Sequence, residues 1–254
     1  MATDPLRFLS DDGTPLVGVL DLPGEGVEVR GHAVFAHCFT CSKTLHVVRR
    51  VAAALNKHGL GVLRFDFTGL GESGGAFADS HFTRNTADLR AAVEFMEREG
   101  RPVGLLVGHS LGGAAVLNAA GDLPTVRAVA TIAAPADPAH VRHLFKGGAE
   151  AFDENGRAEV DIGGRPFVIS REFVAELEGH RLEERVAAMR KALMVFHSPT
   201  DPTVGIENAE RIFKAAKHPK SFVSLGDADH LVTDAADAAY IGRLLGAWAG
   251  FVLR

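Results

Sequence analysis

Short apolar runs of strand length alternate along the chain with helix-length amphipathic stretches, and this alternation restricts the fold more than any other feature. Each run is apolar or β-branched, as in strands that are buried on both faces of a sheet. Strands separated by helices favour a parallel sheet, because parallel neighbours need a crossover connection. The runs cover 32–36, 61–67, 103–107, 128–133, 192–196 and 221–225. They predict an α/β fold with a mostly parallel, doubly wound sheet.

Stretches with helical spacing of apolar residues lie between the predicted strands. They cover 45–58, 83–99, 111–120, 206–216 and 235–253. Gly59 and Gly100 directly follow two of them, where helices commonly end. The opening segment, 6–22, alternates apolar and polar residues around a turn at 11–13. We expect residues 1–254 to form one domain with helices on both faces of the sheet.

Residues 137–190 break this rhythm, with charged residues, two Gly-Gly pairs and a predicted hairpin formed by 158–160 and 166–169. Because the segment falls between two predicted sheet strands, we expect a cap inserted above the strand ends. Its phenylalanines either pack the cap onto the sheet or line an apolar acyl pocket. They are Phe145, Phe152, Phe167 and Phe173.

Charge and hydropathy exclude several classes of partner. The chain has 27 Lys and Arg against 32 Asp and Glu, and no basic cluster forms a stripe. Nucleic acid and anionic membrane are therefore not expected as partners. Apolar runs are far shorter than the about 20 residues of a membrane helix. The N-terminus lacks the basic start and apolar stretch of a signal peptide, so a cytoplasmic location is predicted.

The motif Gly108-His109-Ser110-Leu111-Gly112 directly follows a predicted strand and opens a predicted helix. A serine on such a sharp turn projects its hydroxyl above the sheet, and the glycines permit the close backbone approach that the turn needs. The alternative is a helix-capping serine in a glycine-rich turn. The strand-to-helix context favours a nucleophile elbow with Ser110 as the nucleophile.

A serine hydroxyl needs a base to take its proton and a carboxylate to orient that base. Asp201 lies in the loop after the predicted strand 192–196, and His230 lies in the loop after 221–225. This order of serine, acid and histidine is that of the nucleophile-elbow hydrolases. Asp137, one strand earlier, is the competing acid. Asp227 and Asp229, in the loop of the histidine, are expected to shape the turn.

Acyl transfer also needs hydrogen-bond donors for the developing oxyanion. One backbone amide is expected from Leu111, the residue after the nucleophile. The second is expected from Phe39, in the loop that follows the strand 32–36. A backbone donor depends little on the identity of its side chain, so this assignment rests on position.

Together these residues resemble the α/β-hydrolase superfamily over essentially the whole chain. The segments 35–43, 63–71 and 108–113 are similar to the hydrolase half of bacterial proteins that join an α/β-hydrolase to an OsmC-type domain. The general superfamily pattern has His-Gly where this chain has His37-Cys38. The peroxidase activity of OsmC domains does not carry over, while an OsmC-type partner and a homo-oligomer both stay open.

Two other motifs suggest different chemistry. The segment 69–74 spells the Gly-x-Gly-x-x-Gly dinucleotide fingerprint, but the predicted helix begins several residues too late to hold a pyrophosphate. Cys38 and Cys41 form a C-x-x-C pair, too small for a disulfide framework and consistent with reduced thiols. Oxidation of this pair is a hypothetical switch that would distort the loop of Phe39. No cofactor and no metal site is expected.

The predicted function is a cofactor-independent serine hydrolase that cleaves small to medium carboxylic esters through an acyl-enzyme on Ser110. Thioesterases and peptidases use the same machinery and stay open as alternatives. A hydrolase-fold binding or scaffold module for an OsmC-type redox partner is the alternative from another class.

Overall fold

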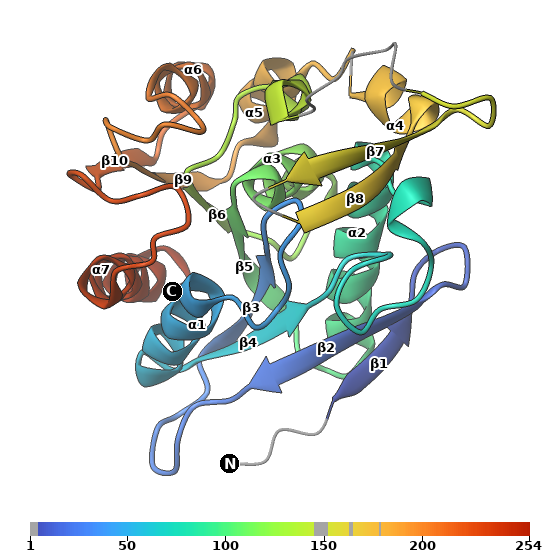
Figure 1. Cartoon of the computed structure of the whole chain (residues 1–254). Helices are drawn as coiled ribbons and strands as arrows, with labels where there is room; N and C mark the ends of the chain where they lie inside the picture. Colours follow the sequence, from blue (N-terminus) through green and yellow to red (C-terminus); the bar gives the residue numbers. More distant parts are fainter. Residues whose placement is uncertain (1–4, 145–151, 163–164, 178) are drawn as a thin grey trace.

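The computed structural model describes residues 5–144, 152–162, 165–177 and 179–254. The central feature is an eight-stranded sheet in the order β1-β2-β4-β3-β5-β6-β9-β10 (Figure 1). Its strands are β1 Leu6–Leu9, β2 Pro15–Asp21, β3 Gly31–Ala36, β4 Leu60–Phe65, β5 Val103–His109, β6 Ala128–Ile132, β9 Ala192–His197 and β10 Lys220–Ser224. Each of the six predicted apolar runs forms one of these strands, and they pair in parallel. The predicted α/β fold is confirmed.

The opening segment, 6–22, adds two antiparallel strands to one edge of the sheet. Strand β1 pairs with β2, and β2 pairs with β4, both antiparallel. Strand β4 ends at Phe65, two residues before the predicted end. The chain leaves the sheet there, and the Asp66 amide donates to the carbonyl of Val17 at 3.0 Å.

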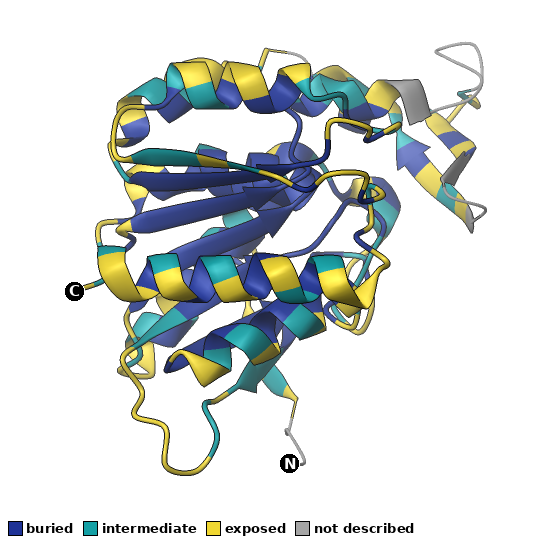
Figure 2. Ribbon diagram, turned by 90° about the vertical axis from the view of Figure 1, so that its left-hand side faces the viewer, coloured by how far each residue is buried: buried dark blue, intermediate teal, exposed yellow. Residues whose placement is uncertain are grey.

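Helices cover both faces of the sheet, as Figures 1 and 2 show. Helices α1 His46–Lys57 and α7 Ala235–Val252 pack on one face. Helices α2 Phe82–Arg98, α3 Leu111–Ala119 and α6 Glu207–Ala215 pack on the other. Strand side chains alternate between the two resulting cores, with Ala33 and Phe35 facing one and Val34 facing the other. This two-sided burial explains why the strands are apolar throughout rather than alternating.

The predicted helix ends agree with the structure to within a residue or two. Gly59 and Gly100, which follow α1 and α2, have φ of 82° and 70°. This left-handed conformation has no steric penalty for glycine, which explains why helices stop there. The N-terminus of α2 is capped by the His81 side chain, which accepts a hydrogen bond from the amide of Arg84 at 3.1 Å.

Five described elements lie between β6 and β9, where the insertion is expected. They are η3 Pro138–Leu144, β7 Arg157–Ile162, β8 Arg165–Ser170, α4 Arg171–Glu176 and α5 Leu182–Met189. Strands β7 and β8 form the predicted antiparallel hairpin, separate from the main sheet. Helix α5 packs against α3 and α6, so the end of this segment joins the helix layer of the main domain. Phe145 and the two Gly-Gly pairs lie outside the described residues.

Helices α1 and α7 pack closely at Gly242. A Cβ atom at Gly242 would lie 2.4 Å from the Cβ of Ala54 on α1, far inside van der Waals contact. Gly250, on the same helix, has open space around it. We expect Gly242→Ala to lower the free energy of unfolding by about 1–3 kcal/mol, because the two helices must separate. Urea unfolding followed by circular dichroism measures this.

Gly250→Ala is the matched control for helix propensity. Because no atom opposes the added methyl group, it should raise the free energy of unfolding by up to about 1 kcal/mol. Equal effects of the two substitutions would contradict the packing argument.

Candidate active site

Ser110 stands on a strained turn between β5 and α3. Its φ of 53° lies in the left-handed region that a residue with a side chain rarely adopts. Such a conformation costs on the order of 1–3 kcal/mol and persists only when its surroundings impose it. The amide of Ser110 donates to the carbonyl of Ile132 on β6 at 2.9 Å. Helix α3 begins at the next residue, so the hydroxyl stands at the carboxyl edge of the sheet.

The glycines around Ser110 are required by close backbone contacts. A Cβ at Gly108 would lie 2.3 Å from the carbonyl oxygen of Gly112. A Cβ at Gly112 would lie 2.3 Å from the carbonyl oxygen of His37, and one at Gly113 would lie 2.5 Å from the Cβ of Ala134. The first turn of α3 therefore packs directly against the main chain that follows β3 and β6.

Ser110, His230 and Asp201 form one continuous chain of hydrogen bonds. Nε2 of His230 lies 2.9 Å from Oγ of Ser110, and Nδ1 lies 2.8 Å from Oδ2 of Asp201. An ionised carboxylate only accepts, so Nδ1–H donates to Asp201 and Nε2 accepts from the serine hydroxyl. The side chain of Asp201 is fully buried, whereas 12% of the His230 side chain is exposed. The three side chains predicted to act together do lie together.

The loop after β9 keeps Asp201 ionised. Burial acts to raise the pKa of its carboxyl, but the hydrogen bond from His230 and those from the amides of Val204 and Thr203 outweigh burial and lower it. The two amides donate to Oδ1 at 3.0 and 2.8 Å. Asp201 therefore carries a negative charge beside the imidazole, as an orienting carboxylate must.

The competing acids have other partners. Oδ1 of Asp137 accepts the amide of Ala139 at 2.9 Å, so it shapes the start of η3. Asp229 accepts the amide of Leu231 at 2.9 Å and also bonds Thr233, which gives it the expected role in the turn. Neither of these carboxylates hydrogen-bonds His230, whose Nδ1 is occupied by Asp201.

Two buried histidines support the loops of the site, which the sequence did not indicate. His109 donates from Nε2 to the backbone carbonyl of His230 at 2.8 Å. His197 donates from Nε2 to the carbonyl of Val204 at 2.8 Å, in the loop of Asp201. Burial lowers the pKa of both, and that of His109 falls to about 3. Both rings are therefore neutral donors that hold the loops, not bases for the reaction.

The loop 37–41, expected to supply the second amide, lies against the turn of Ser110. The close approach of Gly112 to the carbonyl of His37 brings the two segments into contact. Phe39 is buried, and its ring packs on Phe77 and on Phe173 of α4, with centroids 5.2 Å apart in each pair. Leu111, the first residue of α3, is also buried. The expected phenylalanine packing of the inserted segment thus includes Phe173.

Cys38 and Cys41 correct an expectation, because they are joined by a disulfide in the structure. The sequence favoured reduced thiols. The chain makes a tight turn here, with the amide of Cys41 donating to the carbonyl of Cys38 at 3.2 Å. This turn brings the two Cα atoms to 5.2 Å, within the range that a disulfide spans. The bond closes a small ring around Phe39.

The glycine-rich segment 69–74 has no dinucleotide geometry. It is followed by the short η1 Phe77–Asp79, and α2 begins only at Phe82. A Cβ at Gly69 would lie 2.3 Å from the amide nitrogen of Phe77, so the space above the loop is taken by the chain itself. The fingerprint requires a helix N-terminus at its third glycine, and that helix start is absent from this described loop.

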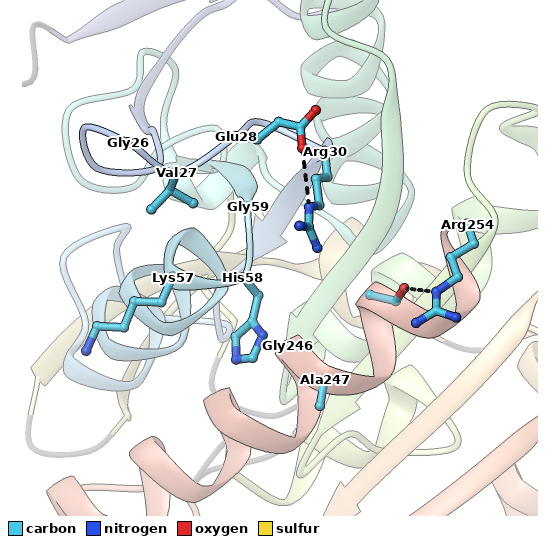
Figure 3. A pocket seen from close by; sticks show the side chains of 11 residues that line it. Gly26, Val27, Glu28, Arg30, Lys57, His58, Gly59, Gly246, Ala247 and Arg254 are labelled. Carbon is cyan, nitrogen blue, oxygen red and sulfur yellow. Dashed lines mark hydrogen bonds and ion pairs between the residues drawn. The ribbon is translucent and has the colours of Figure 1, made fainter.

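A pocket elsewhere on the molecule is a poor competitor for this site. Figure 3 shows it between the loop of Arg30, the end of α1 and the last turns of α7. It has a volume of about 510 Å³ and is lined by charged residues that include Lys57 and Arg254. These two cations lie at or just beyond the ends of their helices, where they compensate the helix dipoles. Its lining residues include no serine or cysteine beside a histidine.

Within the described residues, no cluster of three or more His, Cys, Asp or Glu could hold a metal ion. Over the same ranges, none of the helices is long and apolar enough to cross a membrane. The cytoplasmic location and the partners expected from the sequence stay predictions.

The buried ring of His109 should make the stability of the protein sensitive to acid. Its pKa is about 3 in the folded chain against an ordinary value of 6.5. Between these values the unfolded chain binds a proton that the folded chain excludes. The free energy of unfolding should therefore fall as the pH falls through this window, by up to about 1.4 kcal/mol per pH unit from this one group.

His109→Gln removes that proton and keeps a donor at the position. Urea unfolding at a series of pH values should show a shallower loss of stability between about pH 6 and pH 4 than in the wild type. The same substitution at the exposed His46 is the control and should keep the wild-type slope. A wild-type slope in His109→Gln would contradict the assignment of a neutral buried ring.

Comparison with known proteins agrees with this fold. The model of the alpha/beta hydrolase family matches residues 33–253. Among curated proteins, the uncharacterized protein YfhR of Escherichia coli K12 is 21% identical over 233 residues, which span 91% of this chain and 74% of that protein.

The solved structures that are similar over nearly the whole chain include an esterase domain and Est1E. The esterase domain of a Rhodothermus marinus protein is 52% identical, with a TM-score of 0.83 and coverage of 100% of both chains. Est1E of Butyrivibrio proteoclasticus, solved with ferulic acid bound, is 23% identical, with a TM-score of 0.84 and coverage of 98% of this chain and 99% of that one. The likeness to Est1E concerns the fold. Since the family model covers most of its length, the chain belongs to the alpha/beta hydrolase family.

Proposed function

We propose that this protein is a serine esterase that cleaves carboxylic esters through an acyl-enzyme on Ser110. The observation that carries the proposal is the unbroken hydrogen-bond chain from Asp201 through His230 to Ser110. The similarity to an esterase domain that is 52% identical over the full chain supports the choice of an ester substrate. Residues 137–190 act in this proposal as the cap over the acyl site.

Acylation depends on the direction of the two hydrogen bonds, in which Ser110 donates to His230 and His230 donates to Asp201. Oγ of Ser110 attacks the carbonyl carbon of the ester while its proton moves to Nε2 of His230. The carbonyl oxygen becomes an oxyanion, which accepts hydrogen bonds from the amides of Leu111 and Phe39. The carbonyl then re-forms, the bond to the alcohol oxygen breaks, and the proton on Nε2 passes to that oxygen. The alcohol leaves and the acyl group stays on Ser110.

Deacylation repeats the sequence with water. Nε2 of His230 takes one proton from water as the oxygen attacks the acyl carbon. Collapse of the second tetrahedral intermediate breaks the bond to Oγ, which receives the proton back from Nε2. The carboxylic acid is released and Ser110 is restored. Asp201 keeps its charge throughout, since its lowered pKa favours the carboxylate beside the imidazolium that forms in each step.

The first test is hydrolysis of p-nitrophenyl esters from acetate to palmitate by the wild type and by Ser110→Ala. We expect turnover in the wild type and a loss of about 10⁵- to 10⁶-fold in kcat in the variant, since the nucleophile is gone. The chain length with the highest kcat/KM measures the acyl pocket. Thr125→Ala, which removes a hydroxyl bonded to Glu97 just before β6, at the opposite end of the sheet strands from Ser110, is the control and should keep activity.

An active-site phosphonate provides the second readout. It should label the wild type at Ser110, as mass spectrometry of the tryptic peptide would show, and fail to label Ser110→Ala. A folded wild type that neither hydrolyses any ester nor takes the label would contradict the esterase proposal. Turnover of thioesters or peptides without ester turnover would redirect it to those substrates.

The identity of the acid is tested separately. Asp201→Asn should lower kcat by about 10⁴-fold. The amide at this position favours the wrong tautomer of His230, and it carries no charge to stabilise the imidazolium. Asp137→Asn should change kcat by less than about threefold. The carboxylate of Asp137 accepts the amide of Ala139 and lies outside the hydrogen bonds that join Asp201, His230 and Ser110. The reverse pattern would move the acid one strand earlier.

A further inference from the structure

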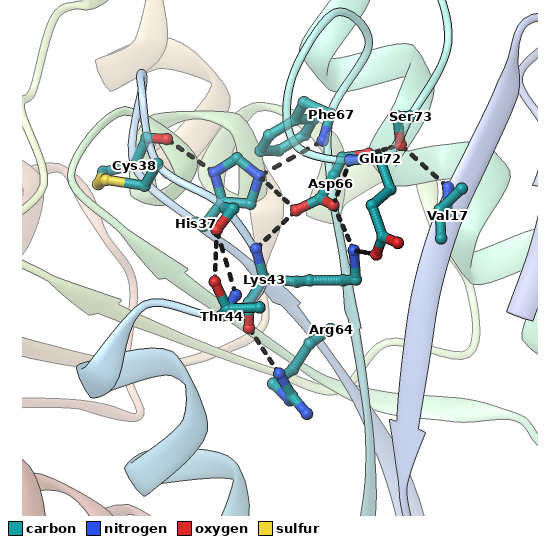
Figure 4. A network of polar contacts seen from close by, with 12 residues as sticks. Val17, His37, Cys38, Lys43, Thr44, Arg64, Asp66, Phe67, Glu72 and Ser73 are labelled. Atoms are coloured by element: carbon teal, nitrogen blue, oxygen red, sulfur yellow. Dashed lines mark hydrogen bonds and ion pairs between the residues drawn. A yellow bond between two sulfur atoms is a disulfide. The ribbon is translucent and has the colours of Figure 1, made fainter. Parts of the chain in front are cut away.

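Asp66 lies at the centre of a buried network that joins three segments of the chain (Figure 4). It follows β4 directly and is fully buried. Its Oδ1 accepts the backbone amide of Lys43 at 2.7 Å, and its Oδ2 accepts the amide of Glu72 at 3.0 Å. The ammonium group of Lys43 donates to Oδ2 at 2.5 Å. One carboxylate therefore fixes both the segment after β3 and the glycine-rich loop.

Lys43 is fixed through both its backbone and its side chain. Only 3% of this residue is exposed, although it carries a charge. Its ammonium group bridges Asp66 and the carboxylate of Glu72, which lies 2.5 Å away. Its carbonyl accepts a hydrogen bond from the guanidinium of Arg64 at 2.5 Å, and Arg64 is itself paired with Asp21. Burial of a lysine in this way requires each charge to be paired.

The glycine-rich loop is shaped to fit this carboxylate. Gly71 has a φ of 54°, and a Cβ there would lie 2.2 Å from Oδ2 of Asp66. The absence of a side chain lets the loop close over the carboxylate and donate the amide of Glu72. The motif that resembles a dinucleotide fingerprint thus has a role in this chain, which is to enclose Asp66.

The segment from His37 to Lys43 lies between two anchors. At its start, the carbonyl of His37 lies against Gly112 in the first turn of α3, next to Ser110. At its end, Lys43 is fixed by Asp66. Phe39, the proposed second oxyanion donor, lies between these anchors. The position of its amide relative to Ser110 therefore depends on where Asp66 holds the end of the segment.

We propose that Asp66 is a positioning residue for ester hydrolysis, which sets the place of the Phe39 amide through its hold on Lys43. The inference rests on the proposed function. An oxyanion donor is effective only within hydrogen-bond distance of the oxygen that develops charge, and its loss costs about 10²- to 10³-fold in kcat. A displacement of about 1 Å can cost a similar factor.

The test is Asp66→Asn in the full chain. The Asn side chain has the size of Asp66, but its NH₂ group is a donor. That group would face one of the N–H groups that now donate to the carboxylate of Asp66. We expect kcat for p-nitrophenyl esters to fall about 10- to 100-fold with KM within about threefold of the wild type. The rate of phosphonate labelling at Ser110 should fall in parallel, since the phosphonyl oxygen occupies the oxyanion position.

Asp88→Asn is the matched control, because Asp88 is also fully buried and also accepts several hydrogen bonds, from Ser10 and Thr68. It should lower stability without changing kcat per titrated active site. Should Asp66→Asn fold poorly, the pair Lys43→Met with Asp66→Asn removes both charges together and restores a neutral interior. This double variant should fold and still show the lower kcat.

Amide hydrogen exchange gives a readout that does not need activity. Residues 37–45 should exchange faster in Asp66→Asn than in the wild type or in Asp88→Asn, while β9 stays unchanged. Unchanged exchange in this segment, or faster exchange with wild-type kcat and labelling, would overturn the role of Asp66. A wild type that shows neither turnover nor labelling would instead overturn the proposed function on which the inference rests.

Discussion

The close packing of the first turn of α3 against the chain that follows β3 and β6 is the constraint on which the site depends. Ser110 keeps its left-handed φ because Gly108, Gly112 and Gly113 let three backbones meet without side chains. The strain of this turn is offset by the two-sided core that fixes β5 and α3. A side chain at any of these glycines would push the nucleophile away from both the histidine and the loop 37–41.

Charge around the site is arranged by burial and pairing. His37, His109 and His197 are buried, and burial lowers the pKa of each, so these rings act as neutral hydrogen-bonding groups. His230, which is hydrogen-bonded to Ser110, is more exposed than these three histidines, and it borders the buried carboxylate of Asp201. Of the imidazoles that the described part of the chain places near this edge of the sheet, that of His230 is aligned between a hydroxyl and a carboxylate.

The hydrogen bond of Ser198 shows how the fold gathers residues from separate loops. Its hydroxyl donates to the carbonyl of Gly226 at 2.9 Å and so ties the loop of Asp201 to the loop of His230. Both loops follow parallel strands, and the carboxyl ends of parallel strands meet at one edge of the sheet. Loop placement therefore favoured a meeting of Ser110, Asp201 and His230, while Asp137 stayed open as the competing acid. Loop placement was not enough to predict the supporting contacts of His109 and His197.

The amino-acid sequence by itself determined the order of strands and helices, the turn of Ser110 and the loops of its two partners, because each depends on local periodicity or on its place along a parallel sheet. Only the tertiary structure decided which buried charges pair. Lys43 and Asp66 are 23 residues apart, and no local pattern relates them. The disulfide of Cys38 and Cys41 was likewise decided by the turn that brings them together. Pairing of this kind depends on distance in space and on burial, which exist only after the chain has folded.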